Sequence, residues 1–292
     1  MLSIKNIIKN IGQKGLLYLH KKTNESSLFH ANIMYYYYKF SGKLYPIEKC
    51  AKLSDKEFEY QNNKERVYLV AESFADRKSK KIYLAMMQVR ATRDYKYLPY
   101  QIIAEKEYFL SALKFGRNEV YIDCGAYDGD TIERFIKKCP NYKNIIAFEP
   151  VQSPFERLKS SCKDYANITL YNEGVYENTT TLNFYPGNYT GSINQAQSKS
   201  EEVVQLKVRS IDSLDLPKVT FIKMDIEGAE IEALKGAERT ILRDKPKLAI
   251  CIYHKNEHML CIPEYIHCLV PQYKLYVRQY NIMNETVLYA TL

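Results

Sequence analysis

The sequence lacks several patterns that would assign the chain to a common class. No apolar run approaches the roughly 18 residues of a membrane-spanning helix, and no signal-peptide cleavage pattern is present. The seven cysteines are odd in number and scattered, and no Cys-x-x-Cys pair occurs among them. These absences give little support to a zinc or redox site, and they predict a cytoplasmic protein without a transmembrane segment.

The first 115 residues differ from the rest of the chain in charge. Residues 1–114 hold 21 Lys and Arg against 11 Asp and Glu, a net charge of +10, and residues 115–292 hold 21 against 23, a net charge of −2; the two sum to +8. Few glycines or prolines interrupt residues 1–115, so we expect a mainly helical region that serves as a cap, an acceptor-binding region or a dimerisation region. Residues 116–292 form the expected catalytic domain.

Two segments of this basic region admit more than one interpretation. In residues 1–22, isoleucine and leucine recur among lysines as in a basic amphipathic helix, which would suit peripheral contact with a membrane. We favour an ordinary surface helix that packs on its own domain. The four consecutive tyrosines at 35–38 resemble a sugar-binding or nucleic-acid-binding surface, but tyrosine is abundant throughout the chain and half-buried positions explain the run more simply.

One stretch, residues 120–131 (Val-Tyr-Ile-Asp-Cys-Gly-Ala-Tyr-Asp-Gly-Asp-Thr), organises the catalytic domain. Its first part is rich in β-branched and aromatic residues and ends at Gly125, which predicts a central strand. Gly125 and Gly129 let the backbone turn tightly, and Asp130 or Thr131 is expected to cap the helix that follows. Strand, glycine turn and helix open a nucleotide-binding βαβ unit.

The charges in this turn select the kind of nucleotide. The glycine spacing is G-x-x-x-G rather than G-x-G-x-x-G, and Asp123, Asp128 and Asp130 lie in or beside the turn. These acids would repel a pyrophosphate by about 1 to 4 kcal/mol per close pair. Glu149 ends the next apolar run, 20 residues after Gly129 (149 − 129 = 20), where an acid accepts hydrogen bonds from ribose hydroxyls. A nucleoside with a cationic tail, such as S-adenosylmethionine, fits this set.

The remaining sequence alternates strands and helices, as in a mostly parallel sheet with helices on both faces. We expect helices at 79–92, 153–162 and 263–269, strands at 168–171, 220–224 and 247–253, a peripheral hairpin of 181–185 with 203–208, and an antiparallel C-terminal pair of 273–278 with 286–291. Residues 68–72 fit a helix or a strand. Ligands collect at the carboxyl ends of parallel strands, where Asp123, Glu149, Asp225 and His254 are expected.

Four motifs in this order resemble the FkbM-type S-adenosylmethionine-dependent methyltransferases. They are Tyr-Ile-Asp-Cys-Gly-Ala-Tyr-Asp-Gly-Asp-Thr at 121–131, Ala-Phe-Glu-Pro at 147–150, Ile-Asp-Ser-Leu at 211–214 and Phe-Ile-Lys-Met-Asp-Ile-Glu-Gly-Ala-Glu at 221–230. The resemblance covers about residues 116–292. It implies a Rossmann-like class I methyltransferase sheet and methyl transfer to oxygen, on a hydroxyl of a sugar, glycan precursor or polar secondary metabolite.

The resemblance also implies roles for individual residues. Asp123, Gly125 and Asp128 would line the methionine side of the cofactor, and Glu149 would bind the ribose. Asn172, Gly174 and Val175 would lie near adenine, whereas Asp212 is either structural or close to the site.

Two residues are candidates for the base that removes the proton of the acceptor hydroxyl. His254 is the first, because imidazole titrates near neutral pH, and Asp225 is the second. The ordinary alternative for His254 is a core histidine whose hydrogen bonds are satisfied, and the ordinary alternative for Asp225 is a helix cap. Glu227, Glu230 and His258 add ligand types that a metal would use, but nothing predicts a helix at 254–258, so we assign no metal site.

The charge of the first 115 residues also admits a different class of function. The basic N-terminal region would suit a nucleic-acid-directed methyltransferase or binding protein. No recognised nucleic-acid-binding motif occurs, and the Asn-Pro-Pro-Tyr type of amino-methylation motif is absent after the strand at 220–224. We therefore expect a small-molecule or carbohydrate acceptor and no nucleic acid, with a homodimer as a further possibility.

Overall fold

The computed structural model describes residues 63–92, 97, 107–185, 192–193, 204–280 and 285–292. The predictions for residues 1–22 and 35–38 lie outside these ranges. The described residues divide into two compact units. The first contains those up to Glu107 with Ile252–Leu260 and Tyr276–Val287, and the second contains Tyr108–Cys251, Cys261–Leu275 and Leu288–Leu292.

Two helices dominate the described N-terminal part of the first unit, α3 (Lys64–Ser73) and α4 (Arg77–Thr92). Residues 68–72, for which the sequence fits a helix or a strand, lie in α3 and are helical. Val67, Val70 and Ala71 form the buried face of this helix. Helix α4 was predicted within two residues. Asp76, between the two helices, accepts a hydrogen bond from the Ser79 backbone and forms an ion pair of 2.7 Å with Arg278.

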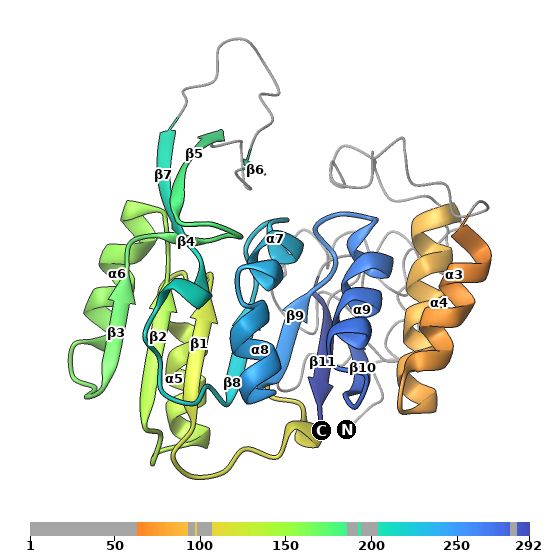
Figure 1. Cartoon of the computed structure of the whole chain (residues 1–292), viewed down its shortest axis with the longest axis horizontal. Helices are drawn as coiled ribbons and strands as arrows, with labels where there is room; N and C mark the ends of the chain where they lie inside the picture. Colours follow the sequence, from red (N-terminus) through yellow and green to blue (C-terminus); the bar gives the residue numbers. More distant parts are fainter. Residues whose placement is uncertain (1–62, 93–96, 98–106, 186–191, 194–203, 281–284) are drawn as a thin grey trace, which may run out of the picture. The chain divides into compact units, whose positions relative to one another are not determined.

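The central sheet has seven strands in the order β10-β11-β9-β8-β1-β2-β3 (Figure 1). Strands β3, β2, β1, β8 and β9 pair in parallel, and β10 and β11 supply the antiparallel C-terminal part, so the predicted fold class is confirmed. The strands are β1 (Val120–Cys124), β2 (Asn144–Phe148), β3 (Ile168–Tyr171), β8 (Phe221–Met224), β9 (Lys247–Cys251), β10 (Lys274–Gln279) and β11 (Thr286–Thr291).

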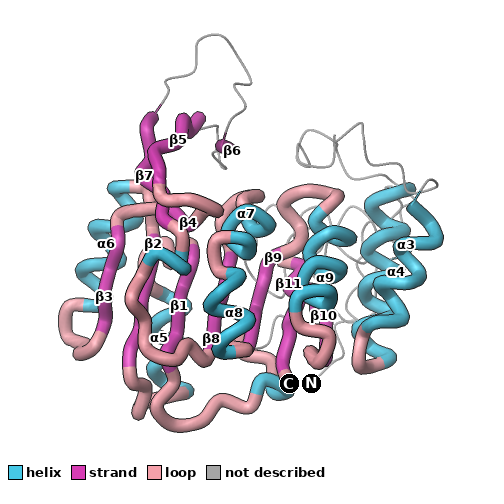
Figure 2. Tube along the Cα trace, viewed as in Figure 1, coloured by secondary structure: helices cyan, strands magenta, loops and turns pink. Residues whose placement is uncertain are grey.

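Helices cover both faces of the parallel strands (Figure 2). The strand order runs one way from β1 to β3 and the other way from β8 to β9, so right-handed crossovers place α5 and α6 on one face and α7 and α8 on the other. The helical segments are α5 (Asp130–Lys138), α6 (Gln152–Cys162), α7 (Glu230–Lys235), α8 (Glu238–Asp244), α9 (His258–Leu269), η5 (Ser111–Leu113) and η6 (Ile211–Ser213). The order reverses between β1 and β8, and this is the switch point where open α/β sheets bind ligands.

A second, four-stranded sheet follows β3, in the order β4-β7-β5-β6. It contains β4 (Gly174–Val175), β5 (Thr180–Tyr185), β6 (Ser192–Ile193) and β7 (Val204–Arg209). Strands β5 and β7 pair antiparallel, which confirms the predicted peripheral hairpin. Gly174 and Val175 lie in β4, parallel to the end of β7.

Three local predictions were wrong. Helix α9 begins at His258, five residues before the predicted start at Pro263, and the proline lies inside the helix. Gly129, in a left-handed conformation, caps α5, so Asp130 and Thr131 are the first residues of the helix and not its cap. Strand β9 ends at Cys251 and not at Tyr253, which leaves His254 beyond the strand.

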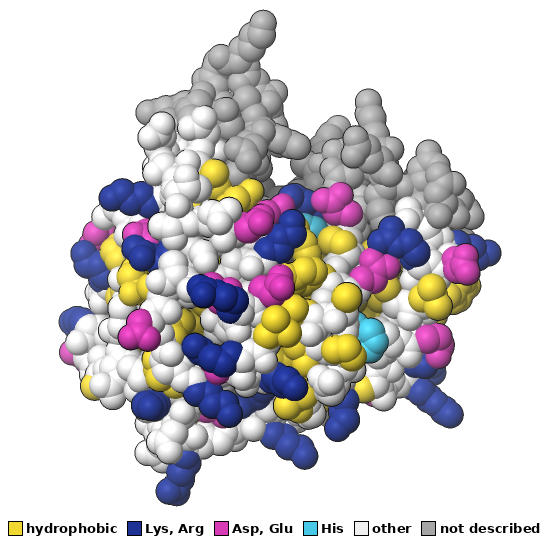
Figure 3. Space-filling model, viewed as in Figure 1, with side chains coloured by type: hydrophobic (Ala, Val, Ile, Leu, Met, Phe, Trp, Pro, Cys, Tyr) yellow, Lys and Arg dark blue, Asp and Glu magenta, His cyan; other side chains and the backbone are white. Residues whose placement is uncertain are grey.

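Exposed lysines lie near the amino ends of three parallel strands. Lys143 directly precedes β2, whereas Lys218 and Lys245 lie three and two residues before β8 and β9. Lys and Arg side chains also line the lower edge of the face in Figure 3. Acids follow the carboxyl ends instead.

Among the described residues, every helix is too short or too polar to cross a membrane.

Candidate functional site

The turn after β1 is held against both neighbouring strands. The backbone amides of Gly125 and Ala126 both donate to the Phe148 carbonyl at 3.0 Å. Gly125 has a φ of +82°, and an added Cβ there would lie 1.9 Å from the carbonyl oxygen of Asp225. Glycine is therefore required at 125 because the turn packs directly on the backbone that follows β8.

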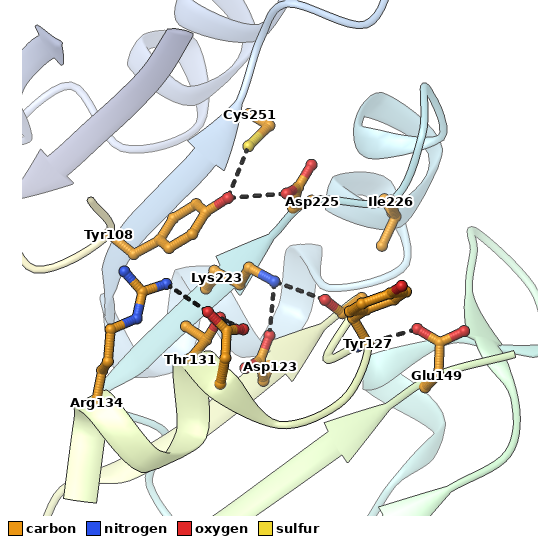
Figure 4. Close-up of polar contacts among 12 residues, drawn as sticks. Tyr108, Asp123, Tyr127, Thr131, Arg134, Glu149, Lys223, Asp225, Ile226 and Cys251 are labelled. Carbon is orange, nitrogen blue, oxygen red and sulfur yellow. Dashed lines mark hydrogen bonds and ion pairs between the residues drawn. The ribbon is translucent and has the colours of Figure 1, made fainter. Parts of the chain in front are cut away.

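A buried ion pair spans the switch point at the base of this turn (Figure 4). Asp123 and Lys223 are in register on β1 and β8, and their side chains, 0% and 2% exposed, are 2.9 Å apart. The Lys223 ammonium also donates to the Gly125 carbonyl at 2.7 Å. Burial alone would lower the pKa of Lys223, but the Asp123 and Asp225 carboxylates outweigh it and hold this pKa above its ordinary value of 10.5.

Glu149 lies directly after β2, and its carboxylate is held by two backbone amides. The Tyr127 amide donates to Oε2 at 3.1 Å and the Val151 amide to Oε1 at 2.9 Å. The residue is 6% exposed, and this burial raises the pKa of Glu149 above its ordinary 4.5 although the two amides and Lys223 lower it. Each oxygen thus keeps a fixed direction, as recognition of a diol requires.

Two of the residues predicted to lie near adenine, Asn172 and Gly174, are close in space to the segment Glu149–Pro150. Asn172 donates from its side-chain amide to the carbonyls of Glu149 and Pro150, at 2.9 and 3.2 Å. An added Cβ at Gly174 would lie 3.2 Å from the Val208 side chain, and Val175 is buried. In this structure Asn172 therefore fixes the backbone that carries Glu149, and its contact with a nucleoside base stays a prediction.

Asp128 and its neighbour Tyr127 occupy the outer part of the glycine turn. Asp128 is half-buried and accepts a 3.4 Å hydrogen bond from the Asp130 amide. Tyr127 is 56% exposed with a φ of +49°, and the Arg157 guanidinium lies 5.0 Å from its ring centroid. This outer part is therefore the more accessible side of the turn.

Asp225 follows β8 and faces the ion pair from the other side of the switch point. It accepts a 2.8 Å hydrogen bond from the Tyr108 hydroxyl. Asp225 does not cap α7: the Ile226 and Gly228 amides donate to the buried Glu230 carboxylate, which closes the turn from within. The alternative of a helix cap is thereby removed for Asp225.

The other candidate base, His254, belongs to the first compact unit. It is buried, and its ring centroid lies 4.0 Å from that of Tyr253. Its role as a base stays a prediction. Asp212, by contrast, is structural: its carboxylate accepts from the Arg239 and Thr240 amides at 2.8 and 2.9 Å, and so it caps α8.

Two residues of this site were not predicted. Lys223 lies within the motif at 221–230 and was given no role, although a lysine inside the apolar run of β8 signals a buried partner. Tyr108 carried no periodic signal. Asp123, Glu149 and Asp225 all interact electrostatically with the buried Lys223 ammonium, and these four side chains by themselves sum to −2 when the three carboxylates are ionised (three minus one).

Comparisons with known proteins agree with this arrangement. The family model of the methyltransferase FkbM domain matches residues 123–267. The crystal structure of an FkbM methyltransferase from Methylobacillus flagellatus KT superposes with a TM-score of 0.67 at 28% identity, over 80% of this chain and 60% of that chain.

Two curated relatives match shorter parts of the chain. The 2-O-methyltransferase NoeI of Sinorhizobium fredii is 22% identical over 147 residues, and the hexuronic acid methyltransferase AglP of Haloferax volcanii is 29% identical over 103 residues. These matches cover 43% and 34% of this chain, which thus spans 60% and 43% of the two relatives. Residues 123–267 of the chain therefore form a methyltransferase FkbM domain, which identifies the family of this part of the protein.

Proposed function

We propose that the protein is an S-adenosylmethionine-dependent O-methyltransferase that acts on a hydroxyl of a sugar, glycan precursor or polar secondary metabolite. The observation that carries the proposal is the Glu149 carboxylate, buried at the carboxyl end of β2 with both oxygens oriented by backbone amides. The names of NoeI and AglP, a 2-O-methyltransferase and a hexuronic acid methyltransferase, support oxygen and sugar as the target.

The charge of the site supports a cationic cofactor. Among the described residues, the buried Lys223 ammonium faces the carboxylates of Asp123, Glu149 and Asp225, and carboxylates arranged in this way suit a sulfonium. Glu149 would bind the ribose hydroxyls. Gly125 and Asp128 would lie along the methionine part with Asp123 behind them, and Asn172, Gly174 and Val175 would border the adenine.

S-adenosylmethionine, when bound, supplies an electrophilic methyl group, so the chain has to align the acceptor and remove one proton. The acceptor oxygen would lose its proton and bond to that methyl carbon, and the sulfur would keep the electron pair of the broken C–S bond. The proton passes to a base, for which Asp225 and His254 are the candidates. The described geometry supports Asp225, whose carboxylate lies beside the glycine turn.

Cofactor binding is tested by isothermal titration of S-adenosylmethionine into the full-length protein. Wild type should bind, and Glu149→Gln should bind about 10- to 100-fold more weakly because it loses charged hydrogen bonds to the ribose. The matched control is Glu156→Gln on α6, an exposed glutamate paired with Lys159. The proposal fails if wild type shows no binding, or if both variants bind alike.

Methyl transfer is tested with a panel of monosaccharides, hexuronic acids and sugar nucleotides, by mass spectrometry of the product. A mass gain of one methyl group with release of S-adenosylhomocysteine is the expected result. Gain on an amine, or on nucleic acid alone, would overturn the assignment to oxygen. A cytoplasmic location, a homodimer and an acceptor-binding role for residues 1–115 stay predictions.

A further inference from the structure

We propose that Tyr108 is a positioning residue that holds the Asp225 carboxylate in the orientation needed for methyl transfer. The inference rests on the proposed function, and it adds a residue that lies outside the matched family domain at 123–267. Tyr108 precedes that domain by fifteen residues (123 − 108 = 15).

The side chain of Tyr108 reaches the functional edge of the sheet from outside it (Figure 4). Its hydroxyl donates to Asp225 Oδ2 at 2.8 Å and lies 3.7 Å from Cys251 Sγ at the end of β9. The Lys223 ammonium lies 5.1 Å from the centroid of the Tyr108 ring. One buried side chain thus contacts the ends of β8 and β9 as well as the cation that pairs with Asp123.

The backbone of Tyr108 is held in an unusual conformation. Its φ is +65°, in the left-handed region that a bulky residue rarely adopts. The Tyr108 amide donates to the Tyr289 hydroxyl of β11 at 3.0 Å, and the residue is 5% exposed. Such conformations persist where the surroundings enforce them and cluster at functional sites, so the outlier itself favours a functional role.

The chemistry explains what this contact would do. An aspartate carboxylate rotates about its side-chain torsions unless hydrogen bonds fix it, and a base has to lie within hydrogen-bond reach of the proton that it accepts. The Tyr108 hydroxyl fixes one oxygen of Asp225, and the ring stacks over Lys223, so the carboxylate and the buried ion pair keep one relative geometry. Tyr108 acts through Asp225 and not on the acceptor itself.

The test compares Tyr108→Phe with Tyr273→Phe in the full-length protein. Tyr273 is a matched control, a buried tyrosine whose hydroxyl donates to the Pro246 carbonyl at 2.5 Å. With the sugar acceptor found in the methylation panel, Tyr108→Phe should lower kcat about 10- to 100-fold, the loss expected for a hydrogen bond to a charged group. The Kd of S-adenosylmethionine and the acceptor KM should change less than about twofold.

A double-mutant cycle separates positioning from a general structural effect. In an Asp225→Ala background, Tyr108→Phe should lower kcat no further, because the group through which it acts is gone. Additive losses would overturn the proposal, as would equal losses in Tyr108→Phe and Tyr273→Phe.

A second readout needs no acceptor. The carboxyl ¹³C resonance of Asp225, assigned by its loss in Asp225→Ala, should move in Tyr108→Phe and stay in place in Tyr273→Phe. An unmoved resonance would refute the hydrogen bond, whether or not the protein methylates a sugar. If the resonance moves in Tyr108→Phe but the wild type binds no S-adenosylmethionine, the hydrogen bond stands and the proposed function alone fails.

Discussion

Replacement of Lys223 by methionine should destabilise the protein strongly. The variant leaves the Asp123 carboxylate, 0% exposed, without its 2.9 Å partner, and it leaves the Gly125 carbonyl without a 2.7 Å donor. Breaking a buried pair from one side costs about 3–5 kcal/mol. At about 2–4 °C per kcal/mol for a domain of this size, Tm should fall by about 6–20 °C.

The double variant Asp123→Asn/Lys223→Met gives the decisive comparison. Replacing both members of a buried ion pair is often nearly neutral, so the double variant should recover about half of the lost Tm or more. The Gly125 carbonyl still lacks its donor, which leaves a deficit of about 1–3 kcal/mol. Thermal unfolding followed by circular dichroism measures all three proteins. Lys137→Met is the control, because its pair with Glu133 is exposed and contributes less than about 1 kcal/mol.

The pH dependence of this effect has a definite sign. The pKa of Lys223 is raised above 10.5 in the folded protein, so its stabilisation is fully present below 10.5 and is lost only as the pH rises through the higher folded value. The Tm gap between wild type and the double variant should therefore be constant across neutral pH. If Lys223→Met lowers Tm no more than Lys137→Met does, the stabilising role of the buried ion pair is refuted.

Two further predictions concern Glu149 and Asp212. Because burial raises the pKa of Glu149, affinity for S-adenosylmethionine should weaken on acidification at a pH above 4.5, whereas the contribution of Glu149 to stability should grow as the pH falls. Calorimetric titration and thermal unfolding at several pH values measure these two opposite trends. Both trends should vanish in Glu149→Gln. Asp212→Ala removes the cap of α8 and should cost about 1–2 kcal/mol in thermal unfolding without changing cofactor affinity, and a large loss of affinity would return Asp212 to the site.

The fold of the second unit was largely predictable because its signals are local. Each parallel strand is a short apolar run, three of them (β1, β2 and β8) end directly before a glycine or an acid, and the predicted strands match the observed ones within two residues. The acids Asp123, Glu149 and Asp225 were expected at one edge because carboxyl ends of parallel strands converge there. The structure places all three within electrostatic reach of Lys223.

The contacts that were missed join residues far apart in the sequence. Tyr108 and Asp225 are 117 residues apart, and no periodic pattern reports a single hydrogen bond over that distance. Asp212 caps a helix 27 residues further along, after β8 and α7 have intervened. Asp123 meets Lys223 only because β8 pairs directly beside β1, which depends on the strand order and not on either strand alone.

The ion pair changes which residue can select a cationic ligand. On sequence alone, Asp123 and Asp128 carried that role, but the charge of Asp123 is largely compensated by Lys223 at 2.9 Å. The negative charge available to a cationic ligand therefore rests more on Asp128 and Glu149 than on Asp123. Because the turn at Gly125 packs on the Asp225 carbonyl and Lys223 binds the Gly125 carbonyl, one buried cation fixes both walls of the switch point. Stability and cofactor selection thus depend on the same contacts, so variants at Asp123 should be judged first by folding and only then by affinity.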